Sequence, residues 1–235
     1  MAQSRDYYPE PVVVEAQGEH TATIFVMHGV GQTTDDMMAA VEAWRQCREL
    51  QSIKWILPQS PTIALTADFG KPTTAWYDVT DVEVDETRSS TDMTRILASQ
   101  RHVQSLIEAE QAQGIPAQRV MLVGFSQGGA IAAGVATTMR DRVGGVVIMS
   151  SRMTTIKIAC QTLPDSIRHK DICFFIAHGI DDRVVPVTEA KACFDSMMEW
   201  EGANVSWHVY PDLGHEMGAD ELEDACEFIR ERLDL

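Results

Sequence analysis

The apolar residues of this chain follow two patterns that alternate along its length. Short runs of consecutive apolar residues, typical of strands buried on both faces, are separated by stretches in which apolar residues recur about every 3.6 positions. We expect strands at 12–15, 21–28, 54–57, 119–124, 145–149, 173–177 and 205–210, and helices at 36–50, 92–113, 127–139, 188–201 and 219–233. This order predicts an α/β fold with a mainly parallel sheet flanked by helices.

The same pattern predicts one domain over residues 1–235. The length is within the range of a single α/β domain, and no linker-like segment divides the chain. The longest stretch without a regular pattern is 59–91. Because an irregular segment of this length inside a compact domain usually serves a function, we expect a loop that borders the functional site.

The charge balance narrows the class of partner. The formal net charge is −16, which repels phosphate backbones and makes nucleic acid a poor candidate. The chain also lacks a basic patch for anionic lipid and a run of apolar residues long enough for a membrane helix, so stable membrane insertion is not expected. The sequence does not determine the oligomeric state, and a homodimer is compatible with it.

The N-terminus and the cysteines indicate a cytoplasmic protein. Residues 1–9 contain no apolar stretch behind a basic start, so we do not expect a secretory signal. The cysteines are odd in number and widely scattered, without a C-x-x-C pair, which is typical of reduced, mostly structural thiols. They are Cys47, Cys160, Cys173, Cys193 and Cys226.

Ser126 is the candidate nucleophile. It lies in Gly124-Phe125-Ser126-Gln127-Gly128, directly after an expected strand and directly before a helix rich in small residues. In that context G-x-S-x-G predicts a nucleophile elbow, a turn so tight that its glycines have no room for side chains. The free N–H groups at the start of the helix favour a developing negative charge.

A catalytic serine needs a base and an orienting carboxylate, which follow it in the order acid, then histidine, in hydrolases of this architecture. His215 lies in a loop after the last expected strand and is the favoured base, since His208 lies inside that strand. The acid is expected after strand 173–177, where Asp181 and Asp182 compete.

Acyl transfer also requires two backbone N–H groups that bind the oxyanion. One is expected from Gln127, the residue after the nucleophile. The second is expected from the glycine-containing loop that follows strand 21–28, where Val30 is the best donor and His28 is expected to be structural.

With these residues assembled, the chain resembles the acyl-protein thioesterase, carboxylesterase and lysophospholipase family of small α/β-hydrolases. The resemblance extends over about 24–233 and rests on several ordered blocks. The blocks are His28-Gly29-Val30-Gly31, Trp55-Ile56-Leu57-Pro58-Gln59-Ser60-Pro61, Ala75-Trp76-Tyr77-Asp78, Gly114-Ile115-Pro116, Gly124-Phe125-Ser126-Gln127-Gly128-Gly129, His178-Gly179 through Val185-Pro186, and Tyr210 with His215.

The resemblance implies an α/β-hydrolase fold without a large cap domain, and it selects Asp182 as the acid through the family spacing H-G-x-x-D-x-x-V-P. It implies that Val30 and Gln127 supply the oxyanion N–H groups. It also implies an acyl groove lined by 62–74, with Leu65, Trp76 and Arg152 as candidate groove residues.

Two departures from the family pattern bear on the substrate. Gln32 stands where the family often has Asp. After strand 145–149 the family often has a small residue, an aromatic residue and then Leu-Pro, whereas this chain has Ser150-Ser151-Arg152-Met153-Thr154. The charge of Arg152 suits a polar or anionic acyl group better than a long lipid.

The function expected from these residues is hydrolysis of carboxylic esters or thioesters through an acyl-serine intermediate. No metal or cofactor is expected, because no His, Cys and Asp cluster has ligand spacing. One alternative is a specialised ester or lactone hydrolase that acts on a small molecule of a metabolic pathway. A second is a non-catalytic receptor on a hydrolase fold, although such a protein should lack part of the triad.

Overall fold

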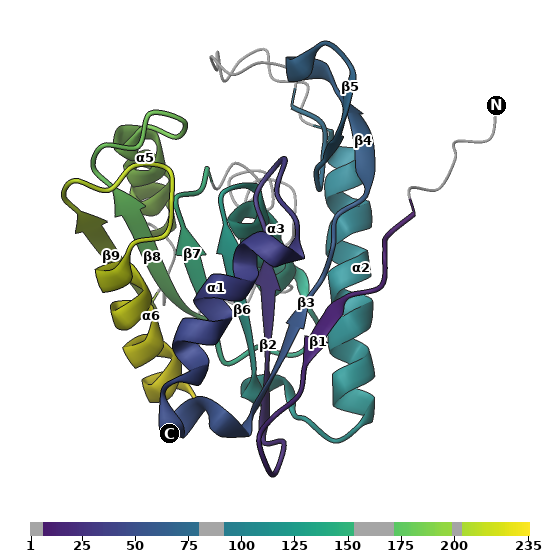
Figure 1. Cartoon of the computed structure of the whole chain (residues 1–235), viewed down its shortest axis with the longest axis vertical. Coiled ribbons are helices and arrows are strands. Elements are labelled where there is room, and N and C mark those ends of the chain that lie inside the picture. Colours follow the sequence, from purple (N-terminus) through teal and green to yellow (C-terminus); the bar gives the residue numbers. More distant parts are fainter. Residues whose placement is uncertain (1–6, 80–91, 153–171, 199–203) are drawn as a thin grey trace.

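A seven-stranded sheet forms the centre of the protein. In the computed structural model, the described residues are 7–79, 92–152, 172–198 and 204–235. The strands are β1 (Val12–Val14), β2 (Ala22–Met27), β3 (Ile53–Leu57), β6 (Val120–Phe125), β7 (Gly145–Met149), β8 (Cys173–Gly179) and β9 (Asn204–Tyr210). They lie in the order β1-β3-β2-β6-β7-β8-β9 (Figure 1). All neighbours are parallel except β1, which runs antiparallel to β3.

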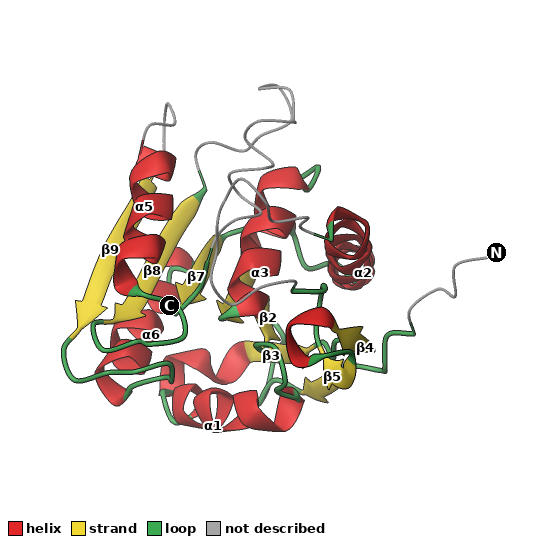
Figure 2. Cartoon of the chain, turned by 90° about the horizontal axis from the view of Figure 1, so that it is seen from above, coloured by secondary structure: helices red, strands yellow, loops and turns green. Residues whose placement is uncertain are grey.

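Helices cover both faces of the sheet, as Figure 2 shows. The helices are α1 (Thr34–Arg45), α2 (Met93–Ala112), α3 (Gln127–Thr138), α5 (Val187–Met198) and α6 (Ala219–Arg232). One apolar core joins the sheet to α2, α3 and α5, and a second joins the opposite face to α1 and α6. The predicted α/β-hydrolase fold with a mainly parallel sheet is therefore confirmed.

Burial on both faces explains why the central strands are apolar at consecutive positions. Every residue of β2, β6, β7 and β8 is buried. The edge strand β9 is only partly buried. Burial of this much apolar surface, at roughly 25 cal/mol per Å², is the main force that holds the sheet between its helices.

The expected boundaries differ from the observed ones chiefly at one helix. The segment predicted as helix 36–50 is α1, which ends at Arg45, followed by a short 3₁₀ helix at Arg48–Ser52. The start of α1 is fixed by a capping box, in which the Thr33 N–H donates to Asp36 Oδ2 at 2.7 Å. Strand β8 continues two residues beyond the predicted end at 177, because His178 and Gly179 pair with β9.

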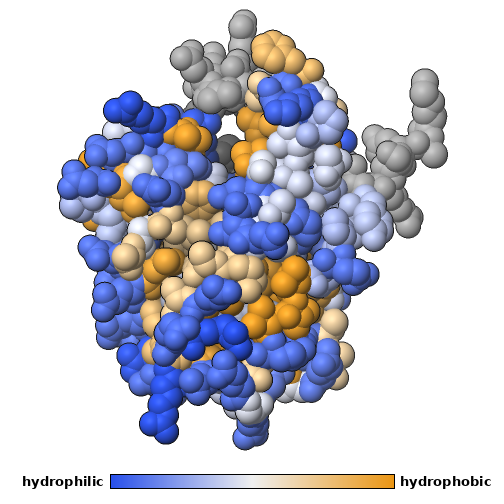
Figure 3. Space-filling view, viewed as in Figure 1, coloured by the Kyte–Doolittle hydropathy of each residue, from blue (hydrophilic) through white to orange (hydrophobic). Residues whose placement is uncertain are grey.

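The segment 59–91 is not irregular throughout, and this part of the prediction was wrong. It contains an antiparallel hairpin formed by β4 (Thr62–Leu65) and β5 (Lys71–Thr74), which projects beyond the sheet (Figure 1). Residues 80–91 of the expected loop lie outside the described residues. The exposed tip of the hairpin carries Phe69, and Figure 3 shows a hydrophobic group at this tip, above a face on which hydrophilic and hydrophobic groups are mixed.

No helix within the described ranges has the length and apolar character needed to span a membrane.

Candidate active site

The site lies at the edge of the sheet where the parallel strands end. Ser126, the loop at Asp182 and the loop at His215 follow β6, β8 and β9, respectively. Because the carboxyl ends of parallel strands share one edge, residues far apart in the sequence meet there.

Ser126 has the backbone strain expected of an elbow. Its φ is 51° and its ψ is −122°, although it is not glycine. Two hydrogen bonds hold this conformation: the Ser126 N–H donates to Met149 O at 2.9 Å, and Gly129 N–H donates to Ser126 O at 3.0 Å. The strain is therefore maintained by β7 on one side and by the first turn of α3 on the other.

Both glycines of the elbow are required because there is no room for a side chain at either position. A Cβ at Gly124 would overlap the backbone of Gly128 and Gly129, and a Cβ at Gly128 would overlap the carbonyl groups of Met27 and His28. The start of α3 therefore packs directly on the end of β2, which brings the serine close to the loop after that strand.

The structure brings the three expected triad residues together. His215 Nε2 lies 3.0 Å from Ser126 Oγ, and His215 Nδ1 lies 2.8 Å from Asp182 Oδ2. The ring of His215 also packs against Phe125, with ring centroids 4.9 Å apart. The expected nucleophile, base and acid are thus in a single hydrogen-bonded chain.

Asp182 is fixed in place by its own loop. Its Oδ1 accepts hydrogen bonds from the N–H groups of Val184 at 2.9 Å and Val185 at 2.8 Å, which leaves Oδ2 for His215. Burial by itself would raise the pKa of Asp182, but the hydrogen bonds from His215, Val185 and Val184 outweigh burial and lower the pKa. The carboxylate is consequently ionised, whereas neighbouring Asp181 is exposed.

His178, which is fully buried, supports the acid from the strand below. Its Nε2 lies 2.7 Å from Val185 O and 3.3 Å from Asp182 Oδ2. Burial lowers the pKa of His178 and outweighs the opposite effects of Val185 and Asp182. A neutral imidazole that donates from Nε2 to the turn at Val185 gives His178 a structural role.

Val30 lies in the loop expected to supply the second oxyanion donor. Among the described residues, its N–H has no hydrogen-bond acceptor. The turn is held by Gln32, whose side chain accepts from Gly29 N–H at 2.8 Å, and by Gly31 N–H, which donates to Thr74 O at 2.7 Å. Gln32 therefore has a structural task at the position where the family often has Asp.

A buried network under this loop was not predicted from the sequence. His28 Nδ1 lies 2.7 Å from Gly29 O, and His28 Nε2 lies 3.1 Å from Ser60 N, so Nδ1 carries the proton and Nε2 accepts. Burial lowers the pKa of His28 and keeps the ring neutral. Gln59 Nε2 lies 3.0 Å from the same Nε2 atom, and its Oε1 accepts from Thr34 N–H at the start of α1.

Trp76 belongs to this network and not to an open groove. Its side chain has no exposed surface, and its Nε1–H donates to His28 O at 2.8 Å. The side chain of Gln127 accepts from Trp76 N–H at 2.7 Å and donates to Tyr77 O at 2.8 Å. The expectation that Trp76 lines the groove is therefore corrected: it ties the loop at His28 to the residue after the nucleophile.

The other two groove candidates have different surroundings. Leu65 is buried in a small cluster with Ile63 and Ala75, against which Val30 packs. Arg152 follows the end of β7, and its Nε pairs with Glu189 Oε2 on α5 at 2.5 Å. The charge of Arg152 is thus compensated within the protein.

Glu221, the third residue of α6, has a buried carboxyl group that was not predicted from the sequence. Its Oε2 accepts from Gly218 N–H at 3.2 Å, whereas Oε1 has no partner among the described residues. Burial, together with the charge of Asp182, raises the pKa of Glu221 to about 7 despite the Gly218 hydrogen bond. A glutamate three residues after the N-cap residue indicates a capping box, but it does not indicate how deeply the carboxyl group is buried.

Comparison with known proteins identifies the family. Residues 8–233 match the family model described as Phospholipase/Carboxylesterase. The chain belongs to the phospholipase/carboxylesterase family. It is a hydrolase, and members of this family that resemble it include acyl-protein thioesterase 1 from Neurospora crassa, which is 35% identical over 95% of this chain and 91% of that protein. Acyl-protein thioesterase 1 from Yarrowia lipolytica is 31% identical over 96% and 98% of the two chains.

A solved structure of this family agrees with the fold. The crystal structure of acyl-protein thioesterase 2 from Zea mays superposes with a TM-score of 0.82 at 27% identity, covering 96% of this chain and 100% of that one. The expected family relationship is thus confirmed over almost the whole chain.

Proposed function

We propose that this protein hydrolyses carboxylic esters or thioesters of acyl groups through a covalent acyl-serine at Ser126. The observation that carries the proposal is the chain of two short hydrogen bonds that joins Ser126 Oγ, His215 and Asp182. The family relationship supports hydrolase chemistry, and the names of the curated relatives support acyl thioesters as the first substrates to test.

In the first step, Ser126 Oγ attacks the substrate carbonyl while His215 Nε2 takes the hydroxyl proton. Asp182 holds the imidazole by its Nδ1–H and stabilises the imidazolium ion. The N–H groups of Val30 and Gln127 bind the oxyanion, and His215 then returns the proton to the departing alkoxide or thiolate.

In the second step, water replaces the leaving group. His215 removes a proton from the water, the resulting hydroxide attacks the acyl carbon, and collapse of the second oxyanion releases the acid and restores Ser126. The strained backbone at Ser126 holds Oγ in position for attack on the substrate carbonyl in the first step.

The surroundings of Arg152 bear on the acyl group. The ion pair with Glu189 neutralises the charge of Arg152 that would have favoured an anionic acyl group. An uncharged acyl chain therefore fits the surroundings of Arg152 better. The expected partners remain acyl esters or thioesters in the cytoplasm, with no nucleic acid, and a homodimer is compatible with the chain.

A fluorophosphonate probe and a substrate series test the proposal together. We expect one equivalent of probe on the peptide that contains Ser126, and turnover of p-nitrophenyl esters and of matched acyl thioesters from acetyl to palmitoyl. Absence of labelling together with absence of turnover would favour the non-catalytic alternative. Labelling with turnover of lactones alone would favour the small-molecule hydrolase.

A further inference from the structure

A short buried segment lies between the two parts of the chain that are expected to supply the oxyanion N–H groups. It comprises residues 74–77, begins at the last residue of β5 and is called the clamp segment below. Ala75 and Trp76 have no exposed surface, and Ala75 N–H donates to Pro61 O at 3.0 Å. The clamp segment is therefore an internal part of the protein, although it continues directly from the projecting hairpin.

On one side, the clamp segment holds the loop that contains Val30. Thr74 Oγ1–H donates to Gln32 O at 2.7 Å, two residues after Val30. Trp76 Nε1–H donates to His28 O at 2.8 Å, two residues before Val30. The loop is thus bound to the same segment on both sides of its expected oxyanion donor.

On the other side, the clamp segment holds the side chain of Gln127. Gln127 Oε1 accepts from Trp76 N–H at 2.7 Å, and Gln127 Nε2 donates to Tyr77 O at 2.8 Å. A glutamine amide carries an acceptor and a donor in one plane, so it satisfies both backbone groups at once. Because this side chain is buried, loss of the amide would leave two backbone groups without partners.

The two oxyanion loops touch each other only through van der Waals contact. A Cβ at Gly29 would lie 3.0 Å from Ser126 Cβ, so the loops are close. Within the described ranges, no hydrogen bond passes directly between 28–32 and Gln127. Helix α2 supports the clamp segment from behind, because Ser99 Oγ–H donates to Trp76 O at 2.7 Å. The relative position of the loops therefore depends on the clamp segment.

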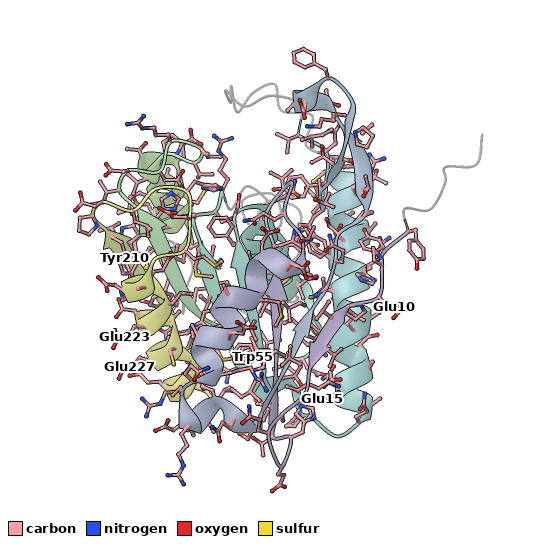
Figure 4. The ribbon with its side chains drawn as sticks, in the orientation of Figure 1. Glu10, Glu15, Trp55, Tyr210, Glu223 and Glu227 are labelled. Atoms are coloured by element: carbon pink, nitrogen blue, oxygen red, sulfur yellow. The ribbon has the colours of Figure 1, made fainter. Side chains whose placement is uncertain are left out.

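The charge of the protein makes the direction of the two N–H groups important. The formal net charge of −16 disfavours a negative oxyanion. Figure 4 shows Glu223 and Glu227 directed outward from α6, below the end of β9 that Tyr210 marks, so these two carboxylates do not point into the site. An oxyanion must consequently be stabilised by well-aligned N–H groups, whose hydrogen bonds weaken steeply when they are misdirected.

We propose that the clamp segment, acting through the indole of Trp76 and the side-chain amide of Gln127, positions the N–H groups of Val30 and Gln127 around the oxyanion. Trp76 and the amide of Gln127 are positioning groups and do not touch the reacting atoms. This inference rests on the proposed hydrolysis at Ser126 and adds to it a device that aligns two distant donors.

The principal test is Gln127→Met, which keeps the length of the side chain and the backbone N–H but removes both amide hydrogen bonds. We expect kcat for p-nitrophenyl acetate to fall about 10- to 100-fold while KM stays within about threefold, because a displaced donor costs most in the transition state. The matched control is Gln100→Met. Gln100 is equally buried but faces Gly134 of α3, so kcat should stay within about twofold.

An alkyl trifluoromethyl ketone supplies a readout that a loss of stability would not change. Ser126 Oγ adds to the ketone carbonyl carbon, the hydroxyl proton passes to His215 Nε2, and the carbonyl oxygen becomes an oxyanion between the two N–H groups. The Ki of the ketone should rise in Gln127→Met by about the factor by which kcat/KM falls. Both quantities are measured at a temperature at which wild type and variant are fully folded.

A second variant tests whether the two sides of the clamp segment act together. Trp76→Phe removes the hydrogen bond to His28 O and should lower kcat by roughly 5- to 20-fold. The double variant with Gln127→Met should lose little more than the larger single loss, since the two groups align one pair of donors. Fully additive losses would contradict a common device.

Three results would overturn the proposal: kcat and ketone Ki of Gln127→Met close to the wild type, a fall in kcat without a rise in Ki, or an equal loss in Gln100→Met. If Gln127→Met does not fold, Thr74→Val removes only the hydrogen bond to Gln32 O, and it should raise Ki by about 3- to 10-fold. A wild-type protein that neither turns over esters nor binds the ketone would contradict the proposed function itself.

Discussion

The edge of the sheet that carries Ser126, Asp182 and His215, called the triad edge below, lies beside the β4–β5 hairpin. The two regions are held by different kinds of contact. At the triad edge, Ser126 and Asp182 are buried, and their positions depend on partners from other strands and loops. The hairpin is held mostly by local contacts: Thr66 N–H and Oγ1–H both donate to the carboxylate of Asp78, and Ala67 N–H donates to Val79 O.

This contrast predicts which substitutions should have large effects on activity or stability. A change at the triad edge removes a group that several distant segments share, whereas a change at the tip of the hairpin affects only its own turn. We therefore expect effects to decrease from the nucleophile, through the acid and the buried carboxyl below it, to the tip of the hairpin.

The largest effect is expected for Ser126→Ala. Without the nucleophile, kcat for p-nitrophenyl acetate should fall by about 10⁴- to 10⁶-fold, because only oxyanion stabilisation and binding remain. The measurement is steady-state kinetics on protein whose Tm matches the wild type. Turnover within tenfold of the wild type would show that another group attacks the ester.

Asp182→Asn is expected to have the next largest effect. The variant should lose roughly 10³- to 10⁴-fold in kcat, because an amide neither fixes the required tautomer of His215 nor stabilises its charged form. Asp181→Asn is the matched control and should stay within twofold, since Asp181 is exposed. Equal losses in the two variants would contradict the assignment of the acid.

Glu221→Gln should change stability by an intermediate amount. The pKa of Glu221 in the folded protein is raised to about 7 from an ordinary value of 4.5. Between these values the folded state keeps a proton that the unfolded state has lost, so the free energy of unfolding falls as pH rises through this window and the cost is complete above it.

Removing the charge should abolish this cost. We expect Glu221→Gln to be more stable than the wild type at pH 8 by about 2 kcal/mol, and to differ much less at pH 4.5. Urea unfolding at both pH values measures the difference. Glu223→Gln, an exposed change on the same helix, should show no such difference between the two pH values.

The smallest effect is expected at the tip of the hairpin. Phe69→Ser should alter the free energy of unfolding by less than about 0.5 kcal/mol, because the ring is fully exposed. Ile63→Ser, at a buried position in the same hairpin, should cost about 2–3 kcal/mol. A large cost at Phe69 would mean that the tip packs against another part of the chain.

Much of the architecture was predictable because its signals are local. Strands β6 and β7 and the start of α3 follow from continuous apolar runs and from the glycines that frame Ser126. The hairpin was not predicted because its segments are short and include Gly70 and Pro72, which are rare in strands. Its pairing also depends on the register between the two strands, which the sequence does not show directly.

The sequence by itself determined the α/β class and predicted Ser126 as the nucleophile together with the order of its partners, since these depend on neighbouring residues and on the alternation of two periods. Only the tertiary structure decided that Trp76 is buried against the loop at His28 and that Arg152 is paired with Glu189. Such contacts depend on how far each element extends and which face it presents, and both are set by packing across the whole sheet.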